Sequence, residues 1–258
     1  MIHLITVHYK AAQWIDVQMD YVARHLHEPV RTYGSLEGVR PEAGRRFDVI
    51  VPAIGAHAGK LNHMARIASD DADDDDLLMF LDGDAFPVAD PMPVVRTALE
   101  KHALVAVQRR ENLGDVNPHP CFCVTTVRTW SSIGGDWSNG WSWRDSRGGE
   151  VSDVGGNLAW QMDRAGLAWQ PLLRTSGQAL HPLWFGVYGG VVYHHGAGFR
   201  RMASRLDYDA LGFDPDAGPL RQVAQQLRVM TRSRQMRRVS SRLFEELCRD
   251  PDFHLRLV

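Results

Sequence analysis

The chain has 258 residues, 44% of them hydrophobic and 23% charged, and its formal net charge is -2. The length suits one large α/β domain or two small ones, and the composition is that of a globular protein. The nearly balanced charge argues against nucleic acid as a partner.

Several features of the sequence favour a cytoplasmic location. The cysteines Cys121, Cys123 and Cys248 form no disulfide framework, which fits a reducing compartment. Residues 1–10 have neither the charged start nor the cleavage site of a signal peptide. No apolar stretch approaches the roughly 20 residues that span a bilayer. We expect a cytoplasmic protein, at most peripheral to the inner membrane face.

Strands and helices alternate along the first 110 residues. Short β-branched runs predict strands, and apolar residues at helical spacing predict helices. The expected strands are 2–8, 30–33, 48–54, 77–81 and 103–108, and the expected helices are 11–27, 61–68 and 94–101. This alternation predicts a Rossmann-like, mostly parallel α/β sheet with helices on both faces.

The second half of the sequence is less regular. Residues 117–147 are rich in Trp, Gly, Ser and Pro and have no clean period, so we expect strands and loops over the carboxyl edge of the sheet. Clearer segments follow: a helix at 157–165 that ends at Gly166, strands at 167–173 and 187–193, and a long helix at 220–247.

These elements predict one domain with a helical tail. We assign residues 1–218 to the domain, with a nucleotide-binding half at 1–110 and an acceptor-side half at 111–218. Residues 219–258 form the tail. No internal repeat and no long flexible linker interrupts this order.

The motif Asp82-Gly83-Asp84 follows the apolar strand 77–81 directly. Ligands bind at the carboxyl edge of open α/β sheets, and residues two apart in an extended chain point the same way. Gly83 lets the backbone bend and leaves space for a ligand. Two carboxylates there suit Mn²⁺ or Mg²⁺, which can neutralise a leaving diphosphate. The alternative is a polar turn that merely ends the strand.

At this motif the chain resembles the GT-A nucleotide-sugar glycosyltransferases, in particular the family-two-like ones. Their Asp-X-Asp motif also follows the fourth strand of a nucleotide-binding half. The segment at 59–62 is similar to the one before that motif, and Asp153, Leu158 and Gly166 are similar to the acceptor-side segment. In this chain Ser152-Asp153 stands where Glu-Asp or Asp-Asp is usual. The resemblance covers roughly residues 1–200.

The resemblance implies a GT-A fold and a metal site. Asp84 is the expected direct ligand of Mn²⁺ (or Mg²⁺), and Asp82 the expected second contact to metal or ribose. A histidine from a late segment completes the metal sphere in several members. Because adjacent strand residues point to opposite faces, one of His194 and His195 would reach the ion, and we favour His195. Alternatively, both histidines bind backbone groups.

The end of the first strand is the expected nucleobase pocket. Thr6, His8 and Tyr9 would line it, with Tyr9 stacked on the base or packed on the next helix. Lys60 and Asn62 would approach the diphosphate or the ribose. The expected donor is a UDP- or GDP-sugar.

The acceptor side offers a candidate base and aromatic side chains. Asp153 is the candidate catalytic base of an inverting transfer, or else a helix N-cap, and a retaining enzyme would not need it. Trp141 and Trp143 could stack on an acceptor sugar, or belong to the core. Arg200 and Arg201 could meet the diphosphate, or be solvated.

The tail carries arginines interleaved with apolar residues. They are Arg221, Arg228, Arg232, Arg234, Arg237, Arg238 and Arg242. Such a helix could lie on an anionic membrane surface near a lipid-linked acceptor, or pack on the domain.

Three hypotheses follow for the function. The first is metal-dependent transfer of a sugar from a nucleotide diphosphate sugar to a hydroxyl acceptor, which could be a glycan, a glycolipid or a small molecule. The second is a nucleotidyltransferase that makes the nucleotide sugar, although residues 8–12 lack the Gly-rich basic loop usual there. The third is a nucleotide- or sugar-binding module without catalysis.

Overall fold

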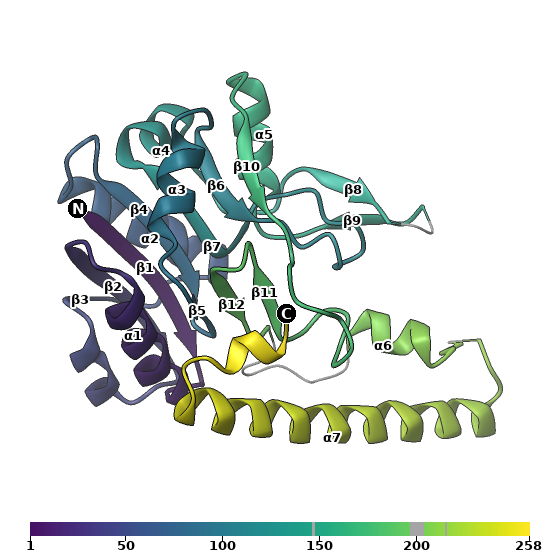
Figure 1. The fold of residues 1–258 in the computed structure, drawn as a ribbon. Coiled ribbons are helices and arrows are strands. Elements are labelled where there is room, and N and C mark those ends of the chain that lie inside the picture. Colours follow the sequence, from purple (N-terminus) through teal and green to yellow (C-terminus); the bar gives the residue numbers. More distant parts are fainter. Residues whose placement is uncertain (146–147, 197–203, 215) are drawn as a thin grey trace.

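A computed structural model describes residues 1–145, 148–196, 204–214 and 216–258. A seven-stranded sheet forms the centre of the molecule (Figure 1). Its strands are β1 (Ile2–Tyr9), β2 (Val30–Glu37), β3 (Val49–Val51), β4 (Leu77–Asp82), β6 (Leu104–Val107), β7 (His119–Thr126) and β10 (Trp169–Leu172). Their spatial order is β10-β6-β7-β4-β1-β2-β3. All pairings are parallel except those of β7, so the predicted mostly parallel α/β class is confirmed.

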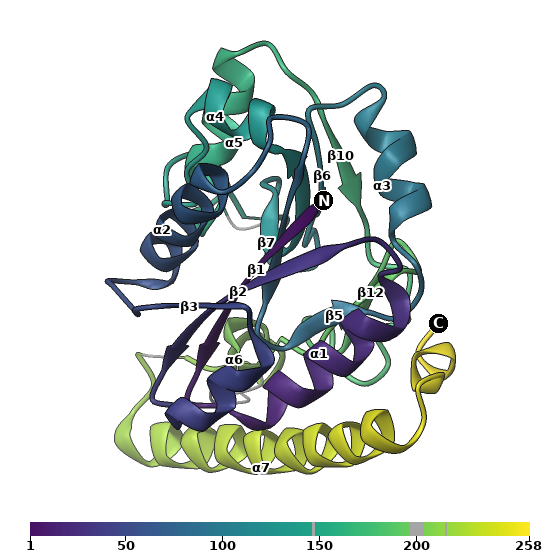
Figure 2. The ribbon, with the colours of Figure 1, turned by 90° about the vertical axis from the view of Figure 1, so that its left-hand side faces the viewer.

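Helices cover both faces of this sheet (Figure 2). On one face lie α1 (Gln13–His25) and α3 (Met92–Leu99), and on the other lie α2 (His57–Asp70), α4 (Val127–Ile133) and α5 (Gly156–Arg164). The short helix η1 (Pro41–Arg46) joins β2 to β3. Strand β4 shows why its sequence is apolar throughout: Met79 packs with α1 and α3, whereas Phe80 packs with the helices opposite. A strand covered on both faces needs apolar residues at every position.

Strand β7 corrects the expectation that residues 117–147 only cover the sheet edge. It lies inside the sheet between β4 and β6, and Cys121 and Cys123 are fully buried. The helix α4 follows it, with the Thr126 side chain accepting the N–H of Thr129 as an N-cap. Because β7 runs antiparallel, its first residue, His119, lies at the carboxyl edge of the parallel strands.

A second, antiparallel sheet stands beside the first. It has the order β11-β12-β5, with β5 (Ala85–Pro87), β11 (Gly186–Tyr188) and β12 (Val192–His194). The single strand expected at 187–193 is therefore two strands, because Gly189 and Gly190 turn the chain with φ of 58° and 70°. The hairpin of β8 (Ser142–Arg144) and β9 (Glu150–Ser152) projects from the body (Figure 1).

The tail comprises α6 (Arg205–Ala210), α7 (Pro219–Arg249) and η2 (Phe253–Arg256). The C-terminal part of α7 packs on α1, where the Tyr21 hydroxyl donates to the Leu247 carbonyl over 2.9 Å. Its N-terminal part extends past the sheets beside α6 (Figure 1). Among the helices in the described ranges, none has the length and apolar character needed to cross a membrane.

Candidate functional site

The turn Asp82-Gly83-Asp84 joins β4 to β5 at the carboxyl edge of the central sheet. A Cβ on Gly83 would lie 2.5 Å from the Val7 carbonyl oxygen and 2.8 Å from Nδ1 of His8. A side chain at this position would therefore collide with β1. The packing of the turn against β1 thus favours glycine here for a reason that the sequence did not reveal, and the expectation that Gly83 leaves space for a ligand stays a prediction.

Gln18, on α1, fixes the backbone of the turn by hydrogen bonds. Its amide nitrogen donates to the carbonyl oxygens of Asp82 and Ala85, each over 2.7 Å. Its amide oxygen lies 3.0 Å from Nε2 of His8, which donates to it. Burial lowers the pKa of His8 to about 4, so this histidine is neutral at pH 7. His8 thus supports the turn and does not line the expected nucleobase pocket.

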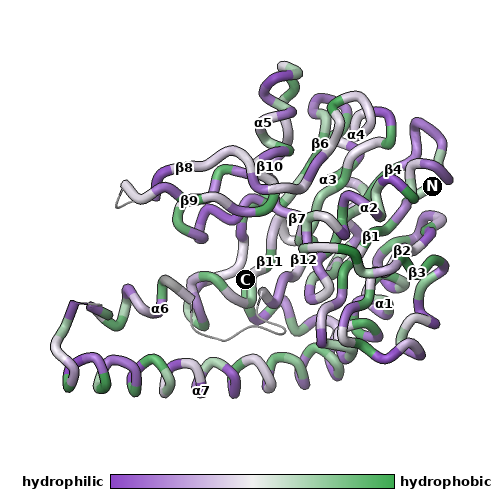
Figure 3. The backbone as a smooth tube through the Cα atoms, turned by 180° about the vertical axis from the view of Figure 1, so that it is seen from behind, coloured by the Kyte–Doolittle hydropathy of each residue, from purple (hydrophilic) through white to green (hydrophobic). Residues whose placement is uncertain are grey.

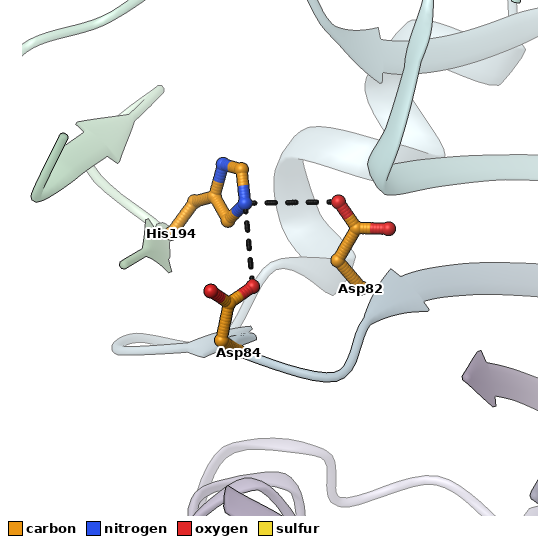
Figure 4. Close-up of side chains that lie close together, drawn as sticks. All are labelled: Asp82, Asp84 and His194. Atoms are coloured by element: carbon orange, nitrogen blue, oxygen red, sulfur yellow. Dashed lines mark ion pairs between the residues drawn. The ribbon is translucent and has the colours of Figure 1, made fainter. Parts of the chain in front are cut away.

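His194 faces both aspartates (Figure 4). Strand β12 pairs with β5 so that His194 lies opposite Ala85, next to Asp84. Its Nε2 is 3.6 Å from Oδ2 of Asp82 and 3.4 Å from Oδ1 of Asp84. A small divalent ion with ligands at about 2.1 Å keeps neighbouring ligand atoms about 3 Å apart. The three side chains therefore fit a divalent ion after shifts of a few tenths of an ångström.

His195 points the other way, which corrects the preference for it as the metal ligand. Its Nδ1 bonds to the Tyr193 hydroxyl over 2.9 Å, and its Nε2 to the Ser240 hydroxyl over 2.7 Å. The ring is fully buried and lies 4.6 Å from the ring of Trp14. Both ring nitrogens are thus occupied in the core between β12 and α7.

Two further histidines contact Asp82. The Nε2 of His57, in the first turn of α2, is 3.1 Å from Oδ1, and the Nδ1 of His119 is 3.9 Å from Oδ2. Burial raises the pKa of Asp82, but the hydrogen bond from His57 and the neighbouring imidazoles lower it more, so the net pKa is well below its usual range. Burial also raises the pKa of Asp84, but His194 brings it down to about 2. Both side chains are carboxylates at neutral pH.

A cavity of about 270 Å³ opens over these carboxylates. It is lined by Val7, Tyr9, His57, Lys60, Asp82, Gly83, Asp84, Arg109, His119, Pro120, Asp153, Val154, His194 and Gly196. At one end the Lys60 ammonium lies 5.9 Å from the centre of the Tyr9 ring and bonds to Glu37. Tyr9 and Lys60, both expected near the nucleotide, thus line the same cavity as the two aspartates.

Two other residues expected at the nucleotide do not line this cavity. Thr6 is fully buried between β4 and β2. The Asn62 side chain donates to Asp136 and accepts the N–H of Trp137 over 2.9 Å. Asn62 therefore ties α2 to the loop before β8, because that loop needs side-chain partners for its backbone.

Asp153 lines the cavity beside Asn112, which follows β6, and β6 is three strands away from β1, which ends at Tyr9. Its Oδ1 accepts the backbone N–H of Val154 over 2.8 Å, and its Oδ2 lies 3.4 Å from the side-chain amide nitrogen of Asn112. The N-cap of α5 is Gly155, so the alternative role of Asp153 as the N-cap is not what the structure shows.

The two tryptophans expected at the acceptor lie outside this cavity. Trp143 is mostly buried and donates its indole N–H to the Leu113 carbonyl over 3.0 Å. Trp141 is exposed and lines a separate surface hollow with Asn117 and Trp169. The expected Arg200 and Arg201 lie outside the described residues.

Four residues of the site were not predicted from the sequence: Gln18, His57, Arg109 and His119. Gln18 had a signal, because it is a polar residue four positions after Trp14 on the buried face of α1. Arg109 also had one, since it follows the strand predicted at 103–108. His119 had none, because it becomes a site residue only when β7 enters the sheet antiparallel.

No protein-family model and no curated protein matches the sequence. The chain is similar in fold to solved glycosyltransferase structures. A mannosyltransferase, PcManGT from Pyrobaculum calidifontis in complex with GDP-Man and Mn2+, is 11% identical over 96% of this chain and 75% of that one, with a TM-score of 0.46. The glucosyl-3-phosphoglycerate synthase from Mycobacterium tuberculosis is 15% identical over 67% and 69%, with a TM-score of 0.44.

Shorter matches also occur. The galactosyltransferase LgtC in complex with donor and acceptor sugar analogs is 12% identical over 50% of this chain, with a TM-score of 0.35. This chain spans 59% of LgtC and 35% of the glycosyltransferase GlyE of Streptococcus pneumoniae. At these scores the similarity concerns the course of the chain and identifies neither donor nor acceptor.

Proposed function

We propose that this protein is a metal-dependent glycosyltransferase that moves a sugar from a nucleotide diphosphate sugar to a hydroxyl acceptor. One observation carries the proposal: Asp82, Asp84 and His194 converge within 4.8 Å in a cavity at the carboxyl edge of the sheet. That edge is where open α/β sheets bind nucleotides. The cluster has the carboxylate oxygens that a phosphate-bound divalent ion requires.

Asp84, Asp82 and His194 would hold the metal ion. An imidazole ligand favours Mn²⁺ over Mg²⁺, because Mg²⁺ strongly prefers oxygen ligands. When bound, the ion would neutralise the diphosphate and stabilise it as a leaving group. His57 donates to Oδ1 of Asp82, whereas His194 faces Oδ2, so His57 would fix the orientation of that carboxylate.

The donor would lie along the first half of the chain, residues 1–110. Tyr9 would stack on the base of a UDP- or GDP-sugar, and Lys60 would lie near its phosphates or ribose. The chain lacks a Gly-rich basic loop after β1, which disfavours the nucleotidyltransferase alternative.

The acceptor would enter from residues 111–218, at the end of the cavity that Asp153 lines. In an inverting transfer Asp153 would take the proton from the acceptor hydroxyl as that oxygen attacks the anomeric carbon. The glycosidic bond to the diphosphate then breaks, and the diphosphate leaves with the electron pair.

The tail, residues 219–258, would contact an anionic membrane surface from the cytoplasm. Along α7, Leu220, Val223, Leu227 and Met230 share one face, and Leu220 is 89% exposed. The helix interleaves hydrophobic and hydrophilic residues (Figure 3). Within the described ranges no carboxylate pairs with the arginines Arg221, Arg228, Arg234, Arg237 and Arg238.

Vesicle binding tests the role of the tail. Sedimentation with vesicles containing phosphatidylserine should pull down wild type, and vesicles of phosphatidylcholine alone should not. Replacing Leu220 and Leu227 by serine should abolish binding. Retention of vesicle binding by that double variant would assign α7 to packing only.

Calorimetry with nucleotides tests the main proposal. UDP, GDP, CDP and dTDP are titrated with Mn²⁺, with Mg²⁺ and with EDTA into wild type and Asp84→Asn. The expected result is that one diphosphate binds with Mn²⁺, at least about 100-fold more weakly in Asp84→Asn. Asp75→Asn, which alters an exposed carboxylate paired with Arg128, is the control and should bind like wild type.

Other results would support other functions. Binding of nucleotides in EDTA as tight as in Mn²⁺ would remove the metal from the mechanism. Release of pyrophosphate from a nucleoside triphosphate and a sugar phosphate would identify a nucleotidyltransferase. If no nucleotide binds to the folded protein, the glycosyltransferase proposal fails.

A further inference from the structure

Arg109 is a buried cation in the cavity wall. It follows β6, is 6% exposed, and lines the same cavity as Asp82 and Asp84. No carboxylate in the described ranges pairs with it. Its Nη2 lies 3.5 Å from the Leu183 carbonyl, at the limit of a hydrogen bond, and no described atom accepts from its Nε. Glu111, Asp153 and Asp115 act on this charge only at longer range, so the buried guanidinium keeps donors that an anion could take directly.

His119 presents a second donor at the same place. Its Nδ1 accepts the backbone N–H of Cys121 over 3.1 Å, so the proton of the neutral ring is on Nε2. This Nε2 lies 3.4 Å from Nη1 of Arg109, which can only donate. Two donors thus face one another without an acceptor between them. An oxyanion beside both nitrogens would satisfy them together.

The position of this pair along the sheet edge tells which part of a substrate it would meet. The strand order β6-β7-β4-β1 places the end of β6, which precedes Arg109, two strands from Asp82 and three from Tyr9. Two strand spacings are about 10 Å. With the base at Tyr9 and the diphosphate at Asp82, His119 would stand next to the diphosphate, since its Nδ1 is 3.9 Å from Oδ2 of Asp82, and Arg109 would lie beyond it, next to the other ring nitrogen of His119. That region also contains Asp153, at the acceptor end of the cavity.

We propose that Arg109 and His119 bind a carboxylate or phosphate group carried by the transferred sugar or by the acceptor. The inference rests on the proposed glycosyl transfer and specifies it: one of the two reacting molecules is acidic beyond the nucleotide diphosphate. A guanidinium fork with an adjacent imidazole N–H recognises either oxyanion in the same geometry. The two sources, donor sugar and acceptor, are separated by experiment.

The test compares ligands that differ in one anionic group. In the donor arm, UDP-glucuronate is compared with UDP-glucose, or GDP-mannuronate with GDP-mannose, in the presence of Mn²⁺. In the acceptor arm, glucuronate and glucose 6-phosphate are each compared with glucose, with the nucleoside diphosphate and Mn²⁺ and again without them. Each titration uses wild type, Arg109→Gln and Arg110→Gln, the last altering the exposed neighbour as a matched control.

In one arm wild type should prefer the anionic ligand by about tenfold or more, as expected for a charge-assisted bidentate contact. Arg109→Gln should lose that preference, and Arg110→Gln should keep it. Without ligand, the Tm of Arg109→Gln should equal or exceed that of wild type, because an unpaired buried charge has been removed.

Three results would overturn the proposal. One is the absence of any preference for the anionic ligand in both arms. Another is weaker binding of the plain nucleoside diphosphate to Arg109→Gln, which would place the guanidinium on the diphosphate. The third is a lower Tm of ligand-free Arg109→Gln, which would make the residue structural. If no nucleotide binds, glycosyl transfer fails as the function, while the acceptor arm without nucleotide still decides whether Arg109 binds an anion.

Discussion

The two halves of the chain contribute to the cavity in different ways. In residues 1–110, Tyr9 and Asp82 stand at the ends of adjacent parallel strands, so regular strand geometry alone brings them to one edge. In residues 111–218, His119 begins an antiparallel strand, Asp153 precedes a helix and His194 ends a hairpin strand. The cavity residues of the first half thus come from the ends of parallel strands, whereas those of the second half come from separate turns and antiparallel pairings.

This difference suggests a division of labour. Side chains held by the parallel strands would bind metal and nucleotide, and those added by the second half would act on the acceptor. His194 crosses this division, because it comes from the second half and faces the aspartates of the first. Substitutions on either side should therefore separate binding from turnover.

The largest expected effect is on turnover by Asp153→Asn. Loss of a general base lowers kcat by roughly 10²- to 10⁴-fold. The Kd of the Mn²⁺–nucleotide complex should be unchanged, because Asp153 is not part of the Asp82, Asp84 and His194 cluster and lies beside Asn112, after β6. Steady-state kinetics with calorimetry measures both quantities. Asp163→Asn, which alters an exposed carboxylate on α5, the helix that follows Asp153, is the control. Normal turnover by Asp153→Asn would point to a retaining mechanism.

The adjacent histidines should give opposite results. His194→Ala should weaken Mn²⁺ binding by roughly 10- to 100-fold and lower the Tm less than His195→Ala does, because the His194 ring lines the cavity beside two carboxylates. His195→Ala should lower the free energy of unfolding by about 2–4 kcal/mol, because it leaves Tyr193 and Ser240 without their partner and opens a cavity beside Trp14. Manganese titration and thermal unfolding of both variants give the comparison.

Results opposite to these would contradict the assignment of metal binding to His194 and of core stability to His195. If His195→Ala lost manganese binding at unchanged stability, the original preference for that residue would be restored. If both variants bound manganese normally, Asp82 and Asp84 would have to act without a histidine.

The sequence predicted the residues that residues 1–110 contribute to the cavity better than those that residues 111–218 contribute. The apolar run at 77–81 and the following Asp82-Gly83-Asp84 have a local pattern that determines both strand and position. Local pattern also gave the element boundaries of α5 and α7 to within a residue or two. By contrast, His119 reaches the cavity through the pairing of β7 with β4, between residues about 40 or more positions apart, which no local period encodes.

The same reason explains the choice between His194 and His195. Alternation along a strand predicts that the two side chains diverge, but not which face meets β5. The register that sets His194 opposite Ala85 decides it. Likewise, Asn62 was assigned by its place beside Lys60, whereas its amide bonds to a loop more than 70 residues away.

Gly83→Ala tests how firmly the first half fixes its turn. The added methyl would lie 2.5 Å from the Val7 carbonyl oxygen, so β1 or the turn must move. We expect a loss of roughly 1–3 kcal/mol of stability together with weaker manganese binding. Gly218→Ala, where a Cβ meets nothing within 4 Å, is the control. Equal stability of Gly83→Ala and wild type in chemical denaturation would contradict the close packing of this turn.

The smallest expected effect is a pH dependence in the second half. Burial, together with the charges of Asp153 and Glu111, raises the pKa of Asp115 to about 7 against the opposing backbone hydrogen bond from Asn117. A carboxyl whose pKa is higher in the folded state than in the unfolded state favours folding below its unfolded pKa, near 4. That contribution is lost as the pH rises through 7.

Between pH 5 and pH 7 the free energy of unfolding of wild type should therefore fall by at most about 2 kcal/mol relative to that of Asp115→Asn, since the amide does not titrate. Denaturant unfolding of both proteins across this range measures the difference, and every other titrating group cancels in the comparison. Parallel curves would show that Asp115 is already ionised at pH 5, stabilised by the nearby Arg109 guanidinium. An oxyanion bound at Arg109 should then compete with that carboxylate, so the same curves recorded with and without glucuronate would connect the buried carboxyl of the second half to the anion subsite.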